Sequence, residues 1–127
     1  MGEHGRRDGG VNDTSASPHC TVRSVDLGSV RWTGGLWADR FEQTREVTLP
    51  YLWEILADAE QGHALSNLRI AAGLEEGEFA GTHWQDEWVY KWLQAAAAIW
   101  EVTRDPALDA RMDEVIEIIG MAQEDDG

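Results

Sequence analysis

The sequence predicts an all-α fold with a short β-like segment before its first helix. Apolar residues recur at every third or fourth position in three stretches, residues 38–62, 85–103 and 106–123, and this spacing is typical of helices that bury one face. About three or four antiparallel helices are expected, since only Arg104 and Asp105 separate the last two stretches and a further short segment lies between the first two. At 127 residues the chain has the length of one domain.

The charge and composition of the chain argue against several classes of binding partner. A formal net charge of −14 argues against nucleic acid and against an anionic membrane surface, because both would repel the chain. The hydrophobic content of 43% is ordinary for a globular protein. The single cysteine, Cys20, cannot form a disulfide within the chain, and no apolar run reaches the roughly 18 residues of a membrane span. No secretory signal is recognisable, so a cytoplasmic location is expected.

Residues 1–20 are predicted to be a disordered leader, because glycine, serine and charged residues offer little to bury. His4, His19 and Cys20 have no second cluster at ligand spacing, so no metal site is predicted there. In residues 21–30 the apolar positions suggest one or two short extended segments around a turn at Asp26-Leu27-Gly28.

The first helix is expected to begin near Ala38 and to end near Gly62, which would provide a left-handed cap. Pro50 lies inside this stretch and lacks an amide hydrogen, so a kink or break is expected there. Residues 63–73 are interpreted as a loop-packing turn with a surface arginine, although Asn67 and Arg69 could also serve a site. An acidic loop, residues 75–78, follows.

The central helix, residues 85–103, carries tryptophans at every fourth position: Trp84, Trp88 and Trp92. Two interpretations remain open, a buried aromatic seam or the wall of a sugar-binding pocket with polar residues between the rings. The last helix is predicted to begin at Asp105-Pro106, because aspartate suits the N-cap and proline suits the first helical position.

Catalytic constellations are not recognisable, and no catalytic residue is assigned. The sequence has no nucleophile elbow, no phosphate-binding glycine loop and no His-Glu-x-x-His motif. Asp86 and Glu87 are adjacent, so on a helix they point about 100° apart and cannot flank one glycosidic bond.

Several motifs occur together in a distinctive order: Gly34-Gly35-Leu36-Trp37, Arg40-Phe41, Thr48-Leu49-Pro50-Tyr51, Asn67-Leu68-Arg69-Ile70-Ala71-Ala72-Gly73, Phe79-Ala80-Gly81, Trp84-Gln85-Asp86, Val89-Tyr90-Lys91-Trp92-Leu93, Asp105-Pro106 and Asp126-Gly127. In this order they resemble the N-terminal part of glycoside hydrolase family 127, which contains β-L-arabinofuranosidases. The resemblance implies a partial α/α-barrel, the first helices of a six-hairpin toroid, with residues 21–127 forming the N-terminal part of its catalytic domain. It also implies carbohydrate as the partner, with Gln85, Asp86, Asn67 and Lys91 as substrate-binding candidates.

The departures from the family pattern concern the central helix and the length. The family usually has Asp-Ser-Asp-Val-Tyr-Lys-Trp-Leu-Glu at the central helix, where this chain has Glu87, Trp88 and Gln94 at three of the positions. Family members run to several hundred residues, and the resemblance places their cysteine nucleophile, zinc and glutamate downstream of the matched region. The chain is therefore expected to be a truncated piece that is inactive alone and contains no zinc ligands. The alternative is a non-catalytic acidic helical module that self-associates or binds a protein partner.

Overall fold

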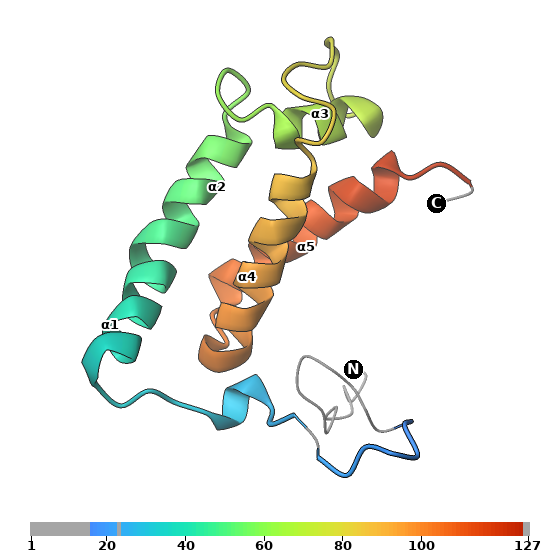
Figure 1. Cartoon of the computed structure of the whole chain (residues 1–127). Helices are drawn as coiled ribbons and strands as arrows, with labels where there is room; N and C mark the ends of the chain where they lie inside the picture. Colours follow the sequence, from blue (N-terminus) through green and yellow to red (C-terminus); the bar gives the residue numbers. More distant parts are fainter. Residues whose placement is uncertain (1–15, 23, 126–127) are drawn as a thin grey trace.

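The computed structural model describes residues 16–22 and 24–125, and this part of the chain is helical without any strand (Figure 1). An all-α fold is thus confirmed. In chain order the elements are η1 (Leu27–Ser29), α1 (Gly35–Gln43), η2 (Thr44–Thr48), α2 (Leu49–Ala57), α3 (Ala64–Ala71), α4 (Glu87–Thr103) and α5 (Pro106–Ala122). In Figure 1, α2 and α4 lie side by side, α5 crosses behind α4, and α3 lies across one end.

The predicted β-like segment before the first helix is wrong. Residues 27–29 instead form the 3₁₀ turn η1, in which Ser29 N donates to Asp26 O at 3.0 Å and Val30 N donates to Leu27 O at 3.3 Å. Val22 and Val25 are both exposed, and neither belongs to a strand. The turn residues at Asp26 and Gly28 decide the local structure in place of β propensity.

The break expected at Pro50 is also wrong, because α1, η2 and α2 form one continuous rod (Figure 1). The π-helical turn η2 precedes the proline, and Leu49 N donates to Thr44 O five residues back. Pro50, the second residue of α2, has no amide hydrogen, so the rod lacks one backbone hydrogen bond directly after the π-helical turn. The irregularity is therefore a widened turn just before the proline.

Gly62 does not cap this helix, contrary to the prediction. The rod ends at Ala57, and the carboxylate of Asp58 accepts from the backbone nitrogens of Glu60 at 2.7 Å and Gln61 at 3.1 Å. Gly62 is buried, and a Cβ there would collide with the carbonyl oxygen of Ile55. Residues 64–71, expected to be a turn, form the two-turn helix α3.

The two long helices α4 and α5 are confirmed close to their predicted bounds. Arg104 ends α4 in the left-handed conformation with a φ of 56°. The Asp105 carboxylate then accepts from Ala107 N at 2.9 Å, and Pro106 is the first residue of α5. The predicted capping chemistry therefore produces the sharp reversal between the two helices.

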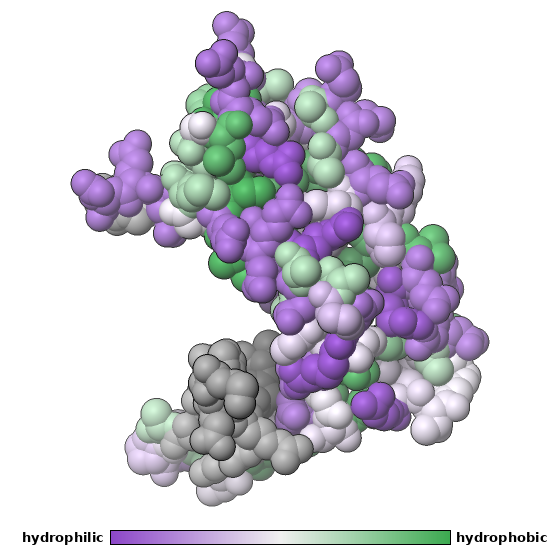
Figure 2. Space-filling model, turned by 180° about the vertical axis from the view of Figure 1, so that it is seen from behind, coloured by the Kyte–Doolittle hydropathy of each residue, from purple (hydrophilic) through white to green (hydrophobic). Residues whose placement is uncertain are grey.

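The core lies where α2, α3, α4 and α5 meet. Small residues allow the helices to approach closely, since Ala64 on α3 and Ala96 on α4 have no exposed surface. The buried cluster consists of Leu49, Leu56, Ala64, Val89, Trp92, Ala96, Ile99, Met112 and Val115. Among the described residues no polar or charged side chain is buried. The face in Figure 2 is largely hydrophilic, with hydrophobic areas between the polar ones.

The predicted leader, residues 1–20, lies mostly outside the described residues. Its described part, residues 16–20, is exposed and contains no helix. Within residues 16–22 and 24–125, no helix is both long enough and apolar enough to cross a membrane.

Candidate functional site

Three of the four candidate residues line one hollow between α3 and the start of α4. This hollow, which we call the loop pocket, has a volume of ≈ 490 Å³. It is lined by Asn67, Leu68, Phe79, Ala80, Gly81, Thr82, His83, Gln85 and Asp86. Residues 79–86 form one of its walls, and α3 contributes Asn67 and Leu68 from the other side.

Asn67 holds the loop by two hydrogen bonds to a single residue. Its Nδ2 donates to the carbonyl oxygen of Ala80 at 2.8 Å, and its Oδ1 accepts from Ala80 N at 3.1 Å. The side chain therefore pairs with the loop backbone as a neighbouring strand would, and it fixes Ala80 against α3.

Gln85 connects the loop to a third segment. Its Oε1 accepts from Thr82 N at 2.9 Å, and its Nε2 donates to the carbonyl oxygen of Gly62. Gly81, with a φ of 82°, passes so close that a Cβ on it would collide with the Gln85 amide. The connection before α3, the loop and the start of α4 are thus joined through one side chain.

Asp86 lies at the point where the loop enters α4 and interacts with Tyr90 one turn later. Burial of the phenol raises the pKa of Tyr90, and the charge of Asp86 and a hydrogen bond to it raise that pKa further. Tyr90 lines a separate hollow beside α5, together with Leu68 and Ile119. The Asp86–Tyr90 pair therefore links a lining residue of the loop pocket to a lining residue of this second hollow.

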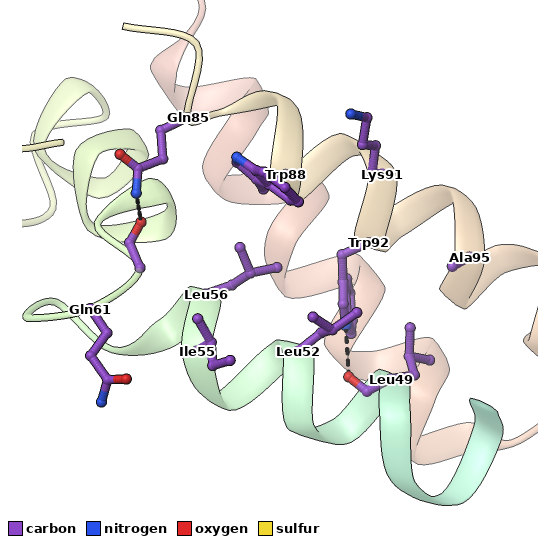
Figure 3. Close-up of a pocket in the computed structure, with 11 residues that line it drawn as sticks. Leu49, Leu52, Ile55, Leu56, Gln61, Gln85, Trp88, Lys91, Trp92 and Ala95 are labelled. Carbon is purple, nitrogen blue, oxygen red and sulfur yellow. Dashed lines mark hydrogen bonds between the residues drawn. The ribbon is translucent and has the colours of Figure 1, made fainter. Parts of the chain in front are cut away.

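Lys91, the fourth candidate, does not face the loop pocket. It lines a different, largely apolar groove of ≈ 360 Å³ between α2 and α4, which we call the helix groove (Figure 3). The groove is lined by Leu49, Leu52, Ile55, Leu56, Gln61, Gly62, Gln85, Trp88, Lys91, Trp92 and Ala95. Lys91 pairs with Glu87 and lies 5.3 Å from the Trp88 ring centre. Only Gln85 among the four candidates lines both hollows.

The three tryptophans at every fourth position, Trp84, Trp88 and Trp92, differ in burial. Trp92 is buried in the core, 4.8 Å from Trp53 between ring centroids, and its Nε1 donates to Leu49 O at 3.1 Å. Trp84 and Trp88 are about half exposed. The prediction of a buried aromatic residue is therefore correct for Trp92, and Trp84 and Trp88 are not part of a buried seam.

Comparison with known proteins places these features in a family. The profile of the "Beta-L-arabinofuranosidase, GH127 catalytic domain" matches residues 29–127. A non-reducing end β-L-arabinofuranosidase from Bifidobacterium longum subsp. longum is 34% identical over the aligned region, which covers 78% of this chain.

The chain belongs to family GH127.

A solved GH127 β-L-arabinofuranosidase from Geobacillus stearothermophilus T6 superposes with a TM-score of 0.72 and 44% sequence identity over 76% of this chain. The helices of this chain accordingly form part of a GH127 α/α-barrel, as the sequence predicted. The chain spans 18% of the length of the Bifidobacterium protein and 16% of the Geobacillus protein.

The positions at which this chain departs from the GH127 pattern lie away from the loop pocket. Glu87 pairs with Lys91, Trp88 lines the helix groove, and Gln94 is exposed on α4. The motif residues Asn67, Gln85 and Asp86, in contrast, all line the loop pocket. Of the three departures, only Trp88 lines the helix groove, and none of them lines the loop pocket.

The sequence alone did not single out His83 and Phe79 as members of the pocket. His83 contacts Trp84 edge-to-face, with ring centroids 4.5 Å apart, and Phe79 is largely exposed at the pocket. The Phe79-Ala80-Gly81 motif was the available signal, but without the fold it does not show which way the loop turns.

Zinc, which the GH127 resemblance implies, does not fit the described part of this chain. Residues 16–22 and 24–125 contain no group of three histidine, cysteine, aspartate or glutamate side chains that could hold a metal ion. Cys20 is exposed, and its thiol donates to Val22 O at 2.9 Å. His4 lies outside the described residues. No step of a reaction is therefore assigned to zinc here.

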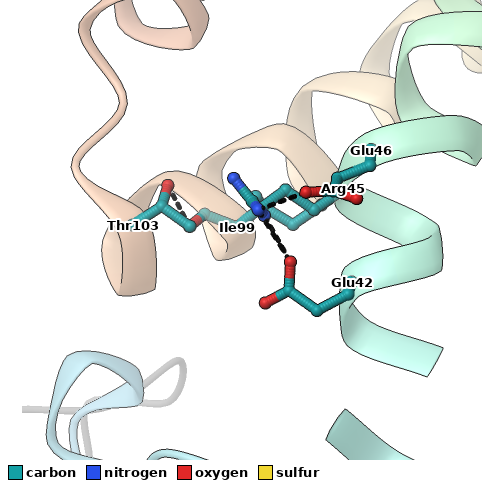
Figure 4. Close-up of polar contacts among 5 residues, drawn as sticks. All are labelled: Glu42, Arg45, Glu46, Ile99 and Thr103. Carbon is teal, nitrogen blue, oxygen red and sulfur yellow. Dashed lines mark hydrogen bonds and ion pairs between the residues drawn. The ribbon is translucent and has the colours of Figure 1, made fainter. Parts of the chain in front are cut away.

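A second polar cluster lies at the opposite end of α4 (Figure 4). Arg45 of η2 pairs with Glu42 and Glu46, each at 2.7 Å. The hydrogen bond that Arg45 donates to the Glu42 carboxylate raises the pKa of the Arg45 guanidinium, and the charges of Glu42, Glu46 and Asp105 raise it further. The cluster connects the last turn of α1 to the π-helical turn η2 through Arg45.

Proposed function

We propose that this chain supplies a section of barrel wall, and one sugar-facing pocket, to a glycoside hydrolase of the β-L-arabinofuranosidase type. The observation that carries the proposal is the gathering of Asn67, Gln85 and Asp86 at the loop pocket, next to the aromatic rings of Phe79 and His83. The family match over residues 29–127 supports the assignment of the pocket to a carbohydrate.

The chemistry of the pocket suits a sugar. Sugar hydroxyls require both donors and acceptors, and the apolar face of a sugar ring packs on an aromatic side chain. The Asp86 carboxylate supplies an acceptor, and the His83 imidazole supplies a polar ring at the same hollow. A pocket of ≈ 490 Å³ lies in the size range of small-molecule sites.

Sugar binding can be tested on the 127-residue chain by NMR titration with methyl β-L-arabinofuranoside. We expect the backbone amide signals of His83 and Asp86 to shift and the Asp86→Asn variant to bind about tenfold more weakly, because a charged acceptor is lost. Lys91→Gln is the matched control, since Lys91 lies in the helix groove. Shifts confined to the helix groove would contradict the assignment of the loop pocket.

We further propose that hydrolysis requires residues beyond those of this chain. The chain covers 16% of the length of the solved relative, and Cys20 lies outside the matched residues 29–127. The purified chain is expected to show no turnover of a chromogenic β-L-arabinofuranoside. Turnover that disappears in a Cys20→Ser variant would contradict this proposal, because the chain would then contain its own nucleophile.

A second candidate function, self-association, is favoured by the helix groove. Leu52 and Trp88 are about half exposed beside a groove whose lining is mostly apolar, and exposed apolar surfaces of this kind drive association. Sedimentation equilibrium would then show a dimer that the Leu52→Glu variant abolishes. Ile116→Glu, at an exposed apolar position on α5 away from the helix groove, is the control. A monomer at high concentration would reject self-association.

A further inference from the structure

We propose that Asn67 and Gln85 are positioning residues that hold the loop pocket in shape, and that Asp86 and His83 make the contacts with the sugar. This division of roles rests on the proposed function, because it concerns the same pocket. From the sequence, Asn67, Gln85 and Asp86 are all candidates for substrate binding, without any difference in role.

Both polar atoms of the Asn67 side chain are occupied by the loop. The Nδ2–Ala80 O distance is 2.8 Å and the Oδ1–Ala80 N distance is 3.1 Å, so one amide satisfies both backbone groups of one residue. Ala80 is 13 residues away in the sequence. The pair is therefore a tertiary link that fixes the distance between α3 and the loop.

Gln85 is occupied in the same way. Its Oε1 accepts from Thr82 N at 2.9 Å, and its Nε2 donates to Gly62 O, which belongs to the buried connection before α3. Each side-chain amide thus donates to one carbonyl and accepts from one backbone N–H. Together they attach the loop at two points, Ala80 and Thr82, on either side of Gly81.

Gly81, between Ala80 and Thr82, allows the loop backbone to lie close to the Gln85 side chain. Gly81 has a φ of 82°, which favours glycine, and a Cβ on it would collide with the Gln85 amide. The backbone can therefore approach the Gln85 side chain closely only without a side chain at this position. Asn67, Gly81 and Gln85 form one unit that sets the shape of the pocket wall.

The remaining polar groups of the pocket are not used in this way. The Asp86 carboxylate is engaged by Tyr90 from its own helix, and His83 makes an aromatic contact with Trp84. Neither side chain attaches the loop to another segment in the described contacts, so both can turn toward a ligand. The geometry assigns contact to these two residues and positioning to the two amides.

Amide hydrogen exchange, followed by NMR on the full 127-residue chain, tests the positioning role directly. The Asn67→Ala variant is expected to lower the protection of the Ala80 amide about tenfold, because that N–H loses its acceptor. Gln85→Ala is expected to do the same at Thr82. Asn67→Asp keeps an acceptor for the Ala80 amide, so its protection should lie between that of the unchanged chain and that of Asn67→Ala. Gln94→Ala, an exposed position on α4, is the control.

Sugar titration of the same variants separates positioning from contact. Asn67→Ala should weaken binding of methyl β-L-arabinofuranoside together with Ala80 protection, whereas Asp86→Asn should weaken binding without changing protection at Ala80 or Thr82. Unchanged protection in Asn67→Ala and Gln85→Ala would overturn the positioning role. If the unchanged chain binds no sugar, the proposed function fails and the exchange data alone decide the positioning role. Should Asn67→Ala unfold, as judged by circular dichroism, the milder Asn67→Asp and Gln85→Glu variants provide the same comparison.

Discussion

The indole nitrogen of Trp92 donates a hydrogen bond of 3.1 Å to the carbonyl oxygen of Leu49, which joins the middle of α4 to the first turn of α2. Only 3% of Trp92 and 4% of Leu49 is exposed. Trp53 packs on the same indole, and the Arg111 guanidinium from α5 lies 4.9 Å from the centre of the Trp53 ring. Trp92 and Trp53 together thereby connect α4, α2 and α5.

The first prediction concerns this tryptophan. Trp92→Phe should lower the free energy of unfolding by about 2 kcal/mol, because it leaves the Leu49 carbonyl without its indole donor and removes part of a buried ring. Trp88→Phe, at a half-exposed position one turn earlier, should cost less than about 1 kcal/mol. Urea unfolding measures both. Equal losses would show that the buried hydrogen bond contributes nothing.

The second prediction concerns the start of α5. Asp105→Ala should destabilise the chain by about 1 kcal/mol, because the carboxylate that accepts from Ala107 N at 2.9 Å is lost. Asp109→Ala removes a carboxylate from the same first turn without removing a capping bond, and should cost about 0.3 kcal/mol. Thermal unfolding of the two variants distinguishes capping from a general effect of charge.

The third prediction uses two glycines. Gly62→Ala should destabilise the chain by about 3 kcal/mol, since a Cβ would collide with the backbone oxygen of Ile55 and that atom cannot move aside. Gly120→Ala should instead stabilise it by about 0.5–1 kcal/mol, because Gly120 lies inside α5 with no atom near the new Cβ. A destabilised Gly120→Ala variant would contradict the open surroundings of that residue.

The fourth prediction concerns alkaline pH. The pKa of Tyr90 is raised by burial and by Asp86, so above about pH 10 the unfolded chain releases the phenolic proton more readily than the folded chain does. The stability that Tyr90 contributes is therefore fully present below its unfolded pKa and is lost as the pH rises through the folded pKa. Tyr90→Phe should show a smaller loss of stability between pH 8 and about pH 11 than the unchanged chain. Parallel pH profiles for the two proteins would contradict the raised pKa.

Local signals allowed the long helices to be predicted, whereas distant contacts decided the rest. The start of α5 follows from two adjacent residues, Asp105 and Pro106, so the sequence was sufficient there. The burial of Trp92 but not Trp88 depends on α2, where the carbonyl of Leu49, 43 residues away in the sequence, accepts the indole hydrogen bond. Periodicity within one helix cannot show which of its faces a second helix covers.

The candidate site likewise depends on contacts between residues that are far apart in the sequence. The GH127 motifs identified Asn67, Gln85 and Asp86, and the fold brings all three to one pocket. Their different roles could not be predicted, because the partners of Asn67 and Gln85 are backbone groups of Ala80 and Gly62, and a sequence motif does not record such partners. Lys91 belongs to the same motif, yet it lies on the face of α4 toward the helix groove.

The π-helical turn at Thr44–Thr48 has a consequence for changes in chain length. Phe41 and Leu49 both pack into the core although they are eight residues apart, and eight residues exceed two regular turns of about 3.6 residues each. The wide turn absorbs the surplus residue, so that the two side chains stay on one face. Removal of one residue from this turn would leave seven, which a regular α-helix also places on one face. The rod can therefore lose a residue here without exchanging its buried and exposed sides, and homologues with a helix one residue shorter can retain the same core.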